Sequence, residues 1–347
     1  MDTDRGKATD QDQRMPQLPP GELPAASPTE RPPLRLTSGL LFRYDQTHAE
    51  TSSDAGKTWV QSGDLTSMRG PINALGGAAI QIQDGRYRGR IVVPMYLEMD
   101  GDHLDYSREE RGGHAIWRGQ RILLETHTHV PEMAGSFVAF SDDDGRTFQN
   151  SKGFLMGYFE DGHLGHASCE EPVVAELKDG RLLCFMRSTT GRILKSYSED
   201  GGESWSKVES TEIAMSNSPC ALKRIPTTGD LVMVWNPMTP DEICRGYRRG
   251  RLSVAVSKDD GLSWEHCKLL EVSPGVEPVA WVDPGPFGPM VRGPIEMGEI
   301  PDGFTHYHYP EIYFEGNQVH IFYLVSSPPG GLPSKWRTFP VRWLYQD

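Results

Sequence analysis

The sequence predicts an all-β protein, a β-propeller built from four-stranded antiparallel blades. Three observations indicate this fold: a short turn motif that recurs along the chain, strand-length apolar runs between the turns, and 37 Gly with 27 Pro among 347 residues. Gly and Pro at this frequency indicate many tight turns, and therefore short strands rather than long helices. A recurring motif is typical of propellers, in which each blade repeats the same small sheet.

The turn motif has the form Ser-x-Asp-x-Gly-x-Ser/Thr-aromatic, and we call it the Asp box. Its Asp can accept hydrogen bonds from the amides of its own turn. Its Gly supplies a positive φ, which other residues adopt only at a cost. Its aromatic residue can pack between neighbouring sheets. The four copies are Ser52–Trp59, Ser141–Phe148, Ser198–Trp205 and Ser257–Trp264.

Strand-length runs divide the chain into five units. The clearest unit lies between Glu171 and Glu209, with strands expected at 173–177, 182–187 and 193–197 and a fourth beginning at Trp205. Four antiparallel strands in one unit describe one propeller blade. The other units are residues 31–65, 77–148, 219–270 and 309–345.

These units differ in completeness. The unit at 31–65 is predicted to be short and incomplete, and the one at 77–148 to contain an insertion near residues 100–135. The last unit shows two clear strands, and the Pro- and Gly-rich stretch 273–304 is predicted to be a long loop. Residues 1–30 are polar and are predicted to be disordered, so the folded domain is expected at 31–347.

Charge and composition exclude several classes of function. The formal net charge is −13, and nothing in the sequence suggests the basic face that nucleic-acid binding needs. An acidic protein can still bind an acidic sugar, but only through a local cluster of arginines. No apolar run is long enough for membrane insertion. Five cysteines without CxxC spacing argue against a disulfide framework and a zinc site, and Cys184 is expected to be buried.

The N-terminus carries no apolar secretory segment. The default expectation is therefore a cytoplasmic protein. A secreted or periplasmic location would follow if the chain begins after a lost leader.

Two stretches resemble the sialidase family of glycosidases, and its bacterial members in particular. They are EEPVVAELKDGRLLCFMRSTTGRILKSYSEDGGESWS and NSPCALKRIPTTGDLVMVWNP, within a resemblance that covers about residues 68–325. The resemblance implies a six-bladed propeller with exo-α-sialidase activity, which removes terminal sialic acid from glycans with retention. It also implies three arginines for the substrate carboxylate, a Tyr nucleophile, a Glu that activates it and an Asp acid/base. Neither a metal nor a cofactor is implied.

The chemistry of sialic acid explains these residue types. The sugar carries a carboxylate on the carbon that is attacked, so an anionic nucleophile would be repelled, whereas a neutral tyrosine would not; sialidases are a known exception of this kind. Because the pKa of tyrosine is near 10, a neighbouring carboxylate must accept its proton. The arginine fork suits a carboxylate, since it donates two parallel hydrogen bonds.

The resemblance assigns the activating carboxylate to Glu171, with Glu170 as the alternative. It assigns one carboxylate-binding arginine to Arg187, which follows Glu171 by 16 residues at the end of the return strand. Two successive antiparallel strands return the chain to the sheet edge where it started. Both side chains can therefore reach one end of the propeller axis.

A second carboxylate-binding arginine is assigned to Arg249, eight residues before the Ser of the fourth Asp box. Three nearby arginines are alternatives: Arg245, Arg248 and Arg251. The nucleophile is assigned to Tyr309, which opens the run YPEIYF, with Tyr307 as the alternative.

The N-terminal part departs from the family pattern. Arg31, in the run Arg-Pro-Pro, could be the third arginine, and Asp45 the acid/base. Alternatively, residues 35–65 correspond to the second blade of the family, and then the third arginine and the acid/base are both missing. This motivates a second hypothesis, a propeller that binds glycan or protein without hydrolysis. A third hypothesis is a glycosidase for another acidic sugar, which would need the same arginines and carboxylates.

Overall fold

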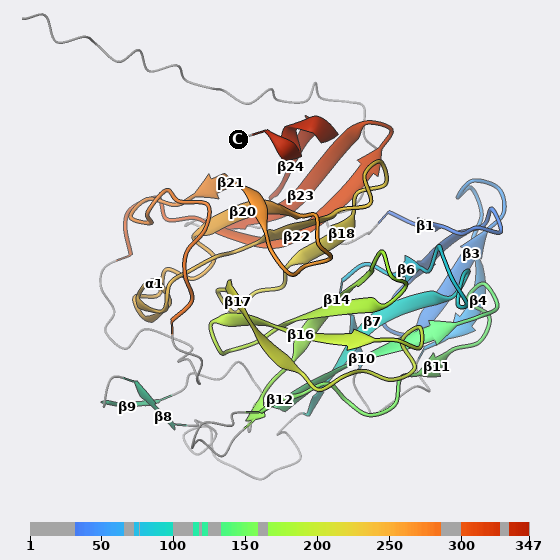
Figure 1. Ribbon diagram of the computed structural model, residues 1–347, viewed down its shortest axis with the longest axis horizontal. Helices are drawn as coiled ribbons and strands as arrows, with labels where there is room; N and C mark the ends of the chain where they lie inside the picture. Colours follow the sequence, from blue (N-terminus) through green and yellow to red (C-terminus); the bar gives the residue numbers. More distant parts are fainter. Residues whose placement is uncertain are drawn as a thin grey trace, which may run out of the picture.

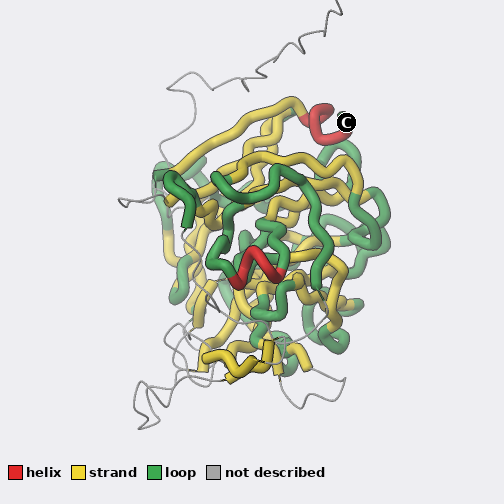
Figure 2. The backbone as a smooth tube through the Cα atoms, turned by 90° about the vertical axis from the view of Figure 1, so that its left-hand side faces the viewer, coloured by secondary structure: helices red, strands yellow, loops and turns green. Residues whose placement is uncertain are grey.

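The computed structural model describes residues 32–65, 73–75, 77–99, 114–117, 120–123, 133–158, 166–285, 300–326 and 333–346. Its strands form five antiparallel sheets that follow one another around the molecule, from β1–β4 to β22–β24 (Figure 1). The sheets are the blades of a propeller, and we number them 1 to 5 in chain order. Among the described residues, helical structure is confined to α1 (Pro240–Cys244) and a 3₁₀ turn at Val341–Tyr345 (Figure 2).

Each blade is a meander of successive strands. Blade 1 has β1 (Leu34–Arg35), β2 (Leu41–Tyr44), β3 (His48–Ser52) and β4 (Val60–Asp64). Blade 2 has β5 (Asn73–Leu75), β6 (Ile80–Gln81), β7 (Ile91–Met99), β10 (Met133–Ser141) and β11 (Gln149–Asn150). Blade 3 has β14 (Glu170–Glu176), β15 (Leu182–Arg187), β16 (Arg192–Ser198) and β17 (Glu209–Ala214). Blade 4 has β18 (Ala221–Arg224), β19 (Leu231–Trp235), β20 (Arg251–Ser257) and β21 (Glu265–Val272), and blade 5 has β22 (His306–Glu315), β23 (Gln318–Ser326) and β24 (Ser334–Pro340).

Two short hairpins lie outside the blades. They are β8 (His114–Trp117) with β9 (Gln120–Leu123), and β12 (Gly157–Tyr158) with β13 (His166–Ala167). The first falls within the insertion that the sequence predicted in blade 2. No helix in the described part of the chain has the length and apolarity needed to cross a membrane.

The structure corrects three expectations about the units. The described residues form five blades, not the six that the resemblance implied. Blade 1 was predicted to be incomplete, but it is a full four-stranded sheet. Blade 5 has a third strand, β24, whose apolar pattern is interrupted by Lys335, Arg337 and Thr338 and therefore gave no clear strand signal. The described parts of 273–304 contain no strand, in agreement with the predicted loop.

Successive blades are joined by shared apolar clusters. Four clusters each combine residues of two neighbouring blades, as Phe42 of blade 1 and Phe137 of blade 2 do. Strand β15 shows why its sequence is continuously apolar: Leu183 and Phe185 face blade 4, while Leu182 and Cys184 face blade 2. Neighbouring side chains on a strand point to opposite faces, and here both faces are buried. Cys184 is fully buried, as predicted.

The Asp boxes have the predicted geometry. Oδ1 of Asp54 accepts a hydrogen bond from the amide of Thr58 at 2.9 Å, and Gly56 has a φ of 86°. The aromatic residue that ends a box lies against the preceding blade, since the rings of Trp264 and Phe185 are 6.2 Å apart. The box therefore closes its own turn and connects two blades.

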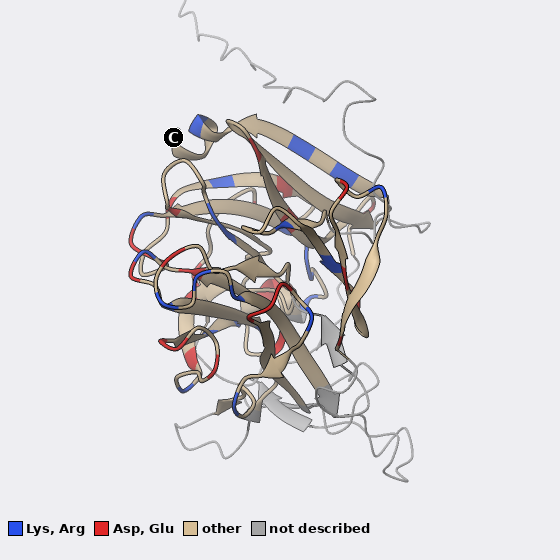
Figure 3. Cartoon of the chain, turned by 90° about the vertical axis from the view of Figure 1, so that its right-hand side faces the viewer, with Lys and Arg blue, Asp and Glu red and all other residues tan. Residues whose placement is uncertain are grey.

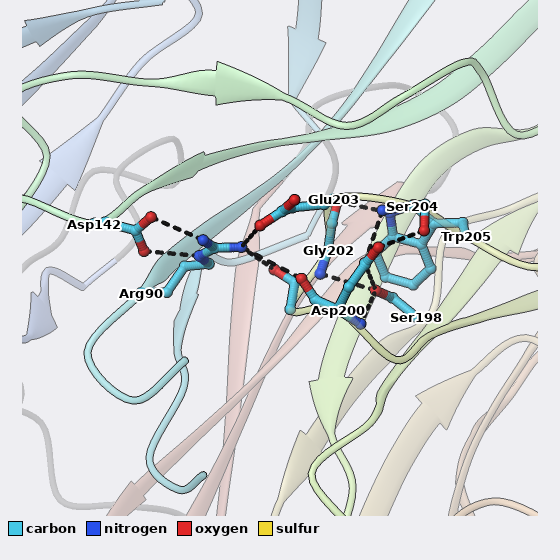
Figure 4. A network of polar contacts seen from close by, with 9 residues as sticks. Arg90, Asp142, Ser198, Asp200, Gly202, Glu203, Ser204 and Trp205 are labelled. Carbon is cyan, nitrogen blue, oxygen red and sulfur yellow. Dashed lines mark hydrogen bonds and ion pairs between the residues drawn. The ribbon is translucent and has the colours of Figure 1, made fainter. Parts of the chain in front are cut away.

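Arg90 links two boxes directly (Figure 4). Its guanidinium donates to both carboxylate oxygens of Asp142 at 2.7 and 2.8 Å, and Nη1 lies 3.1 Å from Oε1 of Glu203. The Arg90 side chain is only 6% exposed. Because Asp142 and Glu203 belong to the boxes of blades 2 and 3, this arginine joins the two blades at the rim that carries the Asp boxes.

Candidate functional site

The predicted site residues of blades 3 to 5 gather at one rim of the propeller. Glu171 lies near the start of β14, Arg187 ends β15, Arg249 precedes β20 and Tyr309 lies early in β22. In antiparallel blades the start of one strand and the end of the next share an edge. The Asp boxes follow β16 and β20, so they lie at the opposite rim.

Arg187 is buried between two carboxylates. Its Nη1 donates to Oε2 of Glu171 at 2.7 Å, and its Nε lies 3.4 Å from Oε2 of Glu170. Arg187 is 6% exposed. Burial alone would lower the pKa of Arg187, but the negative charges of Glu171 and Glu170 outweigh burial and raise it. Both candidate carboxylates therefore belong to the site, and Glu171 makes the shorter contact.

Arg249 lies beside Arg187 but has a different environment. Its Nη1 donates to Nδ1 of His308 at 2.8 Å, and its Nη2 donates to the carbonyl oxygen of Asn217 at 3.3 Å. Among the residues that the structure describes, no carboxylate lies within ion-pair distance of its guanidinium. Burial, and then the positive charge of Arg187, lower the pKa of Arg249, while Glu171 opposes them. Arg249 is thus a partly buried cation held by neutral acceptors.

The neighbouring arginines have other roles. Arg251 is fully buried, and its Nη2 lies 2.8 Å from Oε1 of Glu242. Arg245 is exposed and caps the C-terminus of α1, while the carbonyl of Arg248 contacts His306. Of the four arginines, Arg249 is the one whose guanidinium contacts the other site residues.

Asn217 connects the two site arginines, and the sequence patterns did not single it out. Its Oδ1 accepts a hydrogen bond from Nε of Arg187 at 2.9 Å, while its carbonyl accepts from Arg249. The preceding residue, Ser216, accepts the backbone N–H of Arg249 at 2.7 Å. The sequence does contain a signal that could have pointed to Asn217. It lies in the run NSPC before β18, where short polar residues between two blades indicate a structured turn.

Tyr309 is exposed at the site, whereas Tyr307 is not. Tyr309 is 45% exposed, and the guanidinium carbon of Arg249 lies 5.4 Å from its ring centroid. Tyr307 is 5% exposed and packs against Tyr323 with ring centroids 6.2 Å apart. The structure shows no direct hydrogen bond between Tyr309 and Glu171, and Oε2 of Glu171 accepts one from Arg187 instead.

Four residues of the site have left-handed backbone conformations. The φ values are 42° for Glu171, 43° for Asn217, 54° for Arg249 and 49° for Tyr309. Glu171 and Tyr309 also lie where the strand register shifts, which is the signature of a β-bulge. Such conformations cost about 1–3 kcal/mol each and concentrate at functional sites, where bulges redirect side chains. We refer to Glu171, Arg187, Asn217, Arg249 and Tyr309 as the arginine cluster.

Comparison with known proteins places this chain in a family. Residues 42–321 match the family described as BNR repeat-like domain. The chain belongs to the BNR repeat-like domain family.

Three solved structures illustrate what this chain is similar to. The intramolecular trans-sialidase of Ruminococcus gnavus, in complex with oseltamivir carboxylate, has a TM-score of 0.52 and 16% identity, covering 89% of this chain. This BNR repeat-like chain spans 52% of that protein. The leech intramolecular trans-sialidase has a TM-score of 0.49 and 16% identity, with coverage of 88% and 37%. An α-L-arabinofuranosidase of Fusarium graminearum has a TM-score of 0.44 and 12% identity, with coverage of 90% and 93%.

Of the two N-terminal assignments, the structure describes only Asp45. Arg31 lies outside the described residues. Asp45 lies in the β2–β3 turn at the rim that carries the cluster, and its side chain is 69% exposed. Its Oδ1 accepts hydrogen bonds from Thr47 and from the amide of His48, and these bonds lower its pKa although burial alone would raise it. A carboxyl group that acts as a general acid works best with a raised pKa. The turn instead lowers the pKa of Asp45 and so favours its ionised form.

An open cavity of about 620 Å³ lies at the other rim and contains none of the predicted site residues. Its lining combines basic and acidic side chains, among them Arg86, Arg88, Arg146 and Asp143. Charges of both signs are similarly intermixed along the side of the protein seen in Figure 3. The cavity is therefore separate from the arginine cluster, which lies at the opposite rim.

Proposed function

We propose that this BNR repeat-like protein is an exo-α-sialidase, which hydrolyses terminal sialic acid from glycoconjugates with retention of configuration. The observation that carries the proposal is Arg249, a partly buried guanidinium that neighbours Arg187 and is held by neutral acceptors alone among the described residues. A buried cation is costly unless a negative charge accompanies it. The carboxylate of sialic acid would supply that charge and could accept two hydrogen bonds from the guanidinium.

The mechanism assigns each reacting group to one residue. Arg187 and Arg249 bind the carboxylate and place the anomeric carbon near Tyr309. The Tyr309 oxygen forms a bond to that carbon as its proton passes to Glu171, and the bond to the leaving-group oxygen breaks. The leaving oxygen takes a proton from Asp45. Water then attacks the same carbon, gives a proton to Asp45 and releases Tyr309, which regains its proton from Glu171.

Two contacts bear on whether a bound sugar would be cleaved. The Glu171 carboxylate is engaged with Arg187, and the Asp45 carboxylate with its own turn. These contacts favour a second candidate, a propeller that binds an acidic sugar without cleaving it. The retaining sialidase is supported by the exposed Tyr309 beside Arg249, and by a fold shared with the Ruminococcus gnavus trans-sialidase. The same arginines also suit a glycosidase for a different acidic sugar.

A fluorogenic α-sialoside tests the proposal. The wild-type protein is expected to release the fluorophore, and Tyr309→Phe to abolish release while the circular dichroism spectrum stays unchanged. Tyr307→Phe is the matched control. It also removes a tyrosine hydroxyl, two residues before Tyr309, but from a ring that packs in the core. A folded wild type that binds sialic acid but releases nothing would establish the binding propeller instead. Full activity in Tyr309→Phe would exclude this nucleophile.

A further inference from the structure

A short hydrogen-bonded chain leads away from Arg249 into blade 5. Nη1 of Arg249 lies 2.8 Å from Nδ1 of His308, and Nε2 of His308 lies 2.7 Å from Oγ of Ser326. His308 directly precedes Tyr309, and the two rings are stacked with centroids 6.3 Å apart. His308 therefore touches both a proposed carboxylate-binding residue and the proposed nucleophile.

The chemistry of the two partners defines the form of His308. An arginine has only N–H donors and stays charged, so Nδ1 must present a lone pair to Nη1. In a neutral imidazole the other nitrogen then carries the hydrogen, and Nε2 donates it to Ser326. Protonation of Nδ1 would remove the only acceptor that the side chain offers to Arg249.

We propose that His308 is a positioning residue that holds Arg249 as a neutral acceptor, so that the guanidinium stays oriented toward the site with its charge free for an anionic ligand. The proposal rests on the proposed function for the identity of that ligand, a sugar carboxylate. A carboxylate at this position would hold Arg249 equally well in space. It would also neutralise the guanidinium and compete with the ligand.

The groups around His308 favour its neutral form. Burial, followed by the positive charge of Arg249 and then His306, lowers the pKa of His308 to about 4. Among the described residues, the groups that face it are Arg249 from blade 4, Ser326 from β23, and His306 and Tyr309 from its own strand. Arg248 contacts His306 in turn through its carbonyl. None of these groups is acidic near neutral pH, so His308 remains an acceptor across the physiological range.

Three substitutions separate positioning from simple structural support. His308→Asn keeps an acceptor oxygen near the place of Nδ1, and we expect affinity for sialic acid within about threefold of wild type. His308→Asp puts a carboxylate on Arg249; we expect a stable protein whose affinity falls at least about tenfold. His308→Ala leaves Arg249 unsupported, with a loss of similar size. His320→Asn is the control, because His320 makes a comparable Nδ1 contact to Thr338 elsewhere in blade 5.

The measurements are isothermal titration with sialic acid and with its neutral methyl ester, and ¹⁵N NMR of the histidine rings. NMR is expected to show His308 with Nδ1 unprotonated and Nε2 protonated. A protonated Nδ1, or a His308→Asp protein that binds sialic acid as tightly as wild type, would overturn the proposal. If the wild type bound acid and ester equally, the sialidase proposal would fail, and the tautomer would still decide whether His308 accepts from Arg249.

Discussion

Arg187 and Glu171 are in direct contact, with Nη1 of the arginine 2.7 Å from Oε2 of the glutamate. The contact joins the end of β15 to a residue near the start of β14 that has a φ of 42°. In a regular strand, Glu170 and Glu171 would point to opposite faces. The register shift after Glu170 instead lets both carboxylates reach the same guanidinium.

This contact predicts different outcomes for the two glutamates. Glu171→Gln should lower sialoside hydrolysis by about 10²–10⁴-fold, because it removes the proposed base for Tyr309. Glu170→Gln should retain most of the activity, since its contact with Arg187 is the longer one at 3.4 Å. Steady-state kinetics on both variants decide the assignment. If Glu170→Gln is the inactive protein, the base is the alternative carboxylate.

Arg249 and Arg251 are predicted to differ in what they support. Arg249→Met should weaken binding of sialic acid by about 100-fold, as expected for a charged contact, and change the free energy of unfolding by less than about 1 kcal/mol. Arg251→Met should cost about 3–5 kcal/mol in stability, because it leaves the carboxylate of Glu242 and the carbonyls of Pro237 and Glu277 without their donor.

Titration calorimetry and urea unfolding measure the two effects separately. An Arg249→Met protein that binds sialic acid normally would remove the central support for the sialidase proposal. An Arg251→Met protein of full stability would show that its ion pair is not structural.

The packing of Asp boxes against the preceding blade predicts a clear difference between two glycines. Gly145 and Gly85 have φ values of 82° and 73°, so Ala is strained to a similar degree at both. A Cβ at Gly145 would lie 2.7 Å from the ring of Phe42 in blade 1, whereas nothing lies within 4 Å of one at Gly85. Gly145→Ala should therefore cost about 1–3 kcal/mol more than Gly85→Ala in urea unfolding. Equal costs would mean that the Asp box Ser141–Phe148 is not packed on blade 1.

The carboxylates of the Asp boxes predict instability in acid. Hydrogen bonds, chiefly from Thr58, lower the pKa of Asp54 to about 2, and the pKa of Asp259 is lowered by Ser263 although burial alone would raise it. A folded-state pKa below the unfolded value gives stability that is complete above the unfolded pKa and is lost as pH falls through the folded one. The unfolding free energy should therefore fall as pH decreases from about 5 to about 2.

Asp259→Asn isolates one of these groups, because the amide cannot accept from Ser263 at both positions. Its stability deficit relative to wild type should shrink as pH falls over the same range. The partly buried His306 and His308, whose pKa values are lowered, add a decrease in the free energy of unfolding that begins as pH falls below about 6.5 in both proteins. A deficit that stays constant with pH would show that Asp259 is not stabilised as an anion.

Local patterns made most of the fold readable from the sequence. An Asp box closes its own turn within eight residues, so the roles of Asp54, Gly56 and Trp59 follow from the motif alone. Strand β15 could be recognised as buried because all of its residues except the last are apolar. In the structure all six residues are buried. Blade 1 and strand β24 were underestimated, since short or charged strands lack such a pattern.

The residues of the site could be predicted only in part from the sequence. Spacing and resemblance led to Glu171, Arg187, Arg249 and Tyr309, and the structure brings these four residues to one rim. Asn217 and His308 were missed, because their partners lie about 30 and 59 positions away in other blades.

By itself, then, the sequence determined the blades and the residue types available at the rim, because turn closure and strand alternation depend on neighbours along the chain. Tertiary structure alone decided that Arg249 rather than Arg251 faces the cluster, and that Tyr309 rather than Tyr307 is exposed. Those choices follow from left-handed backbone at single residues and from contacts between blades. Such conformations are stabilised by the surrounding packing, which no local pattern records.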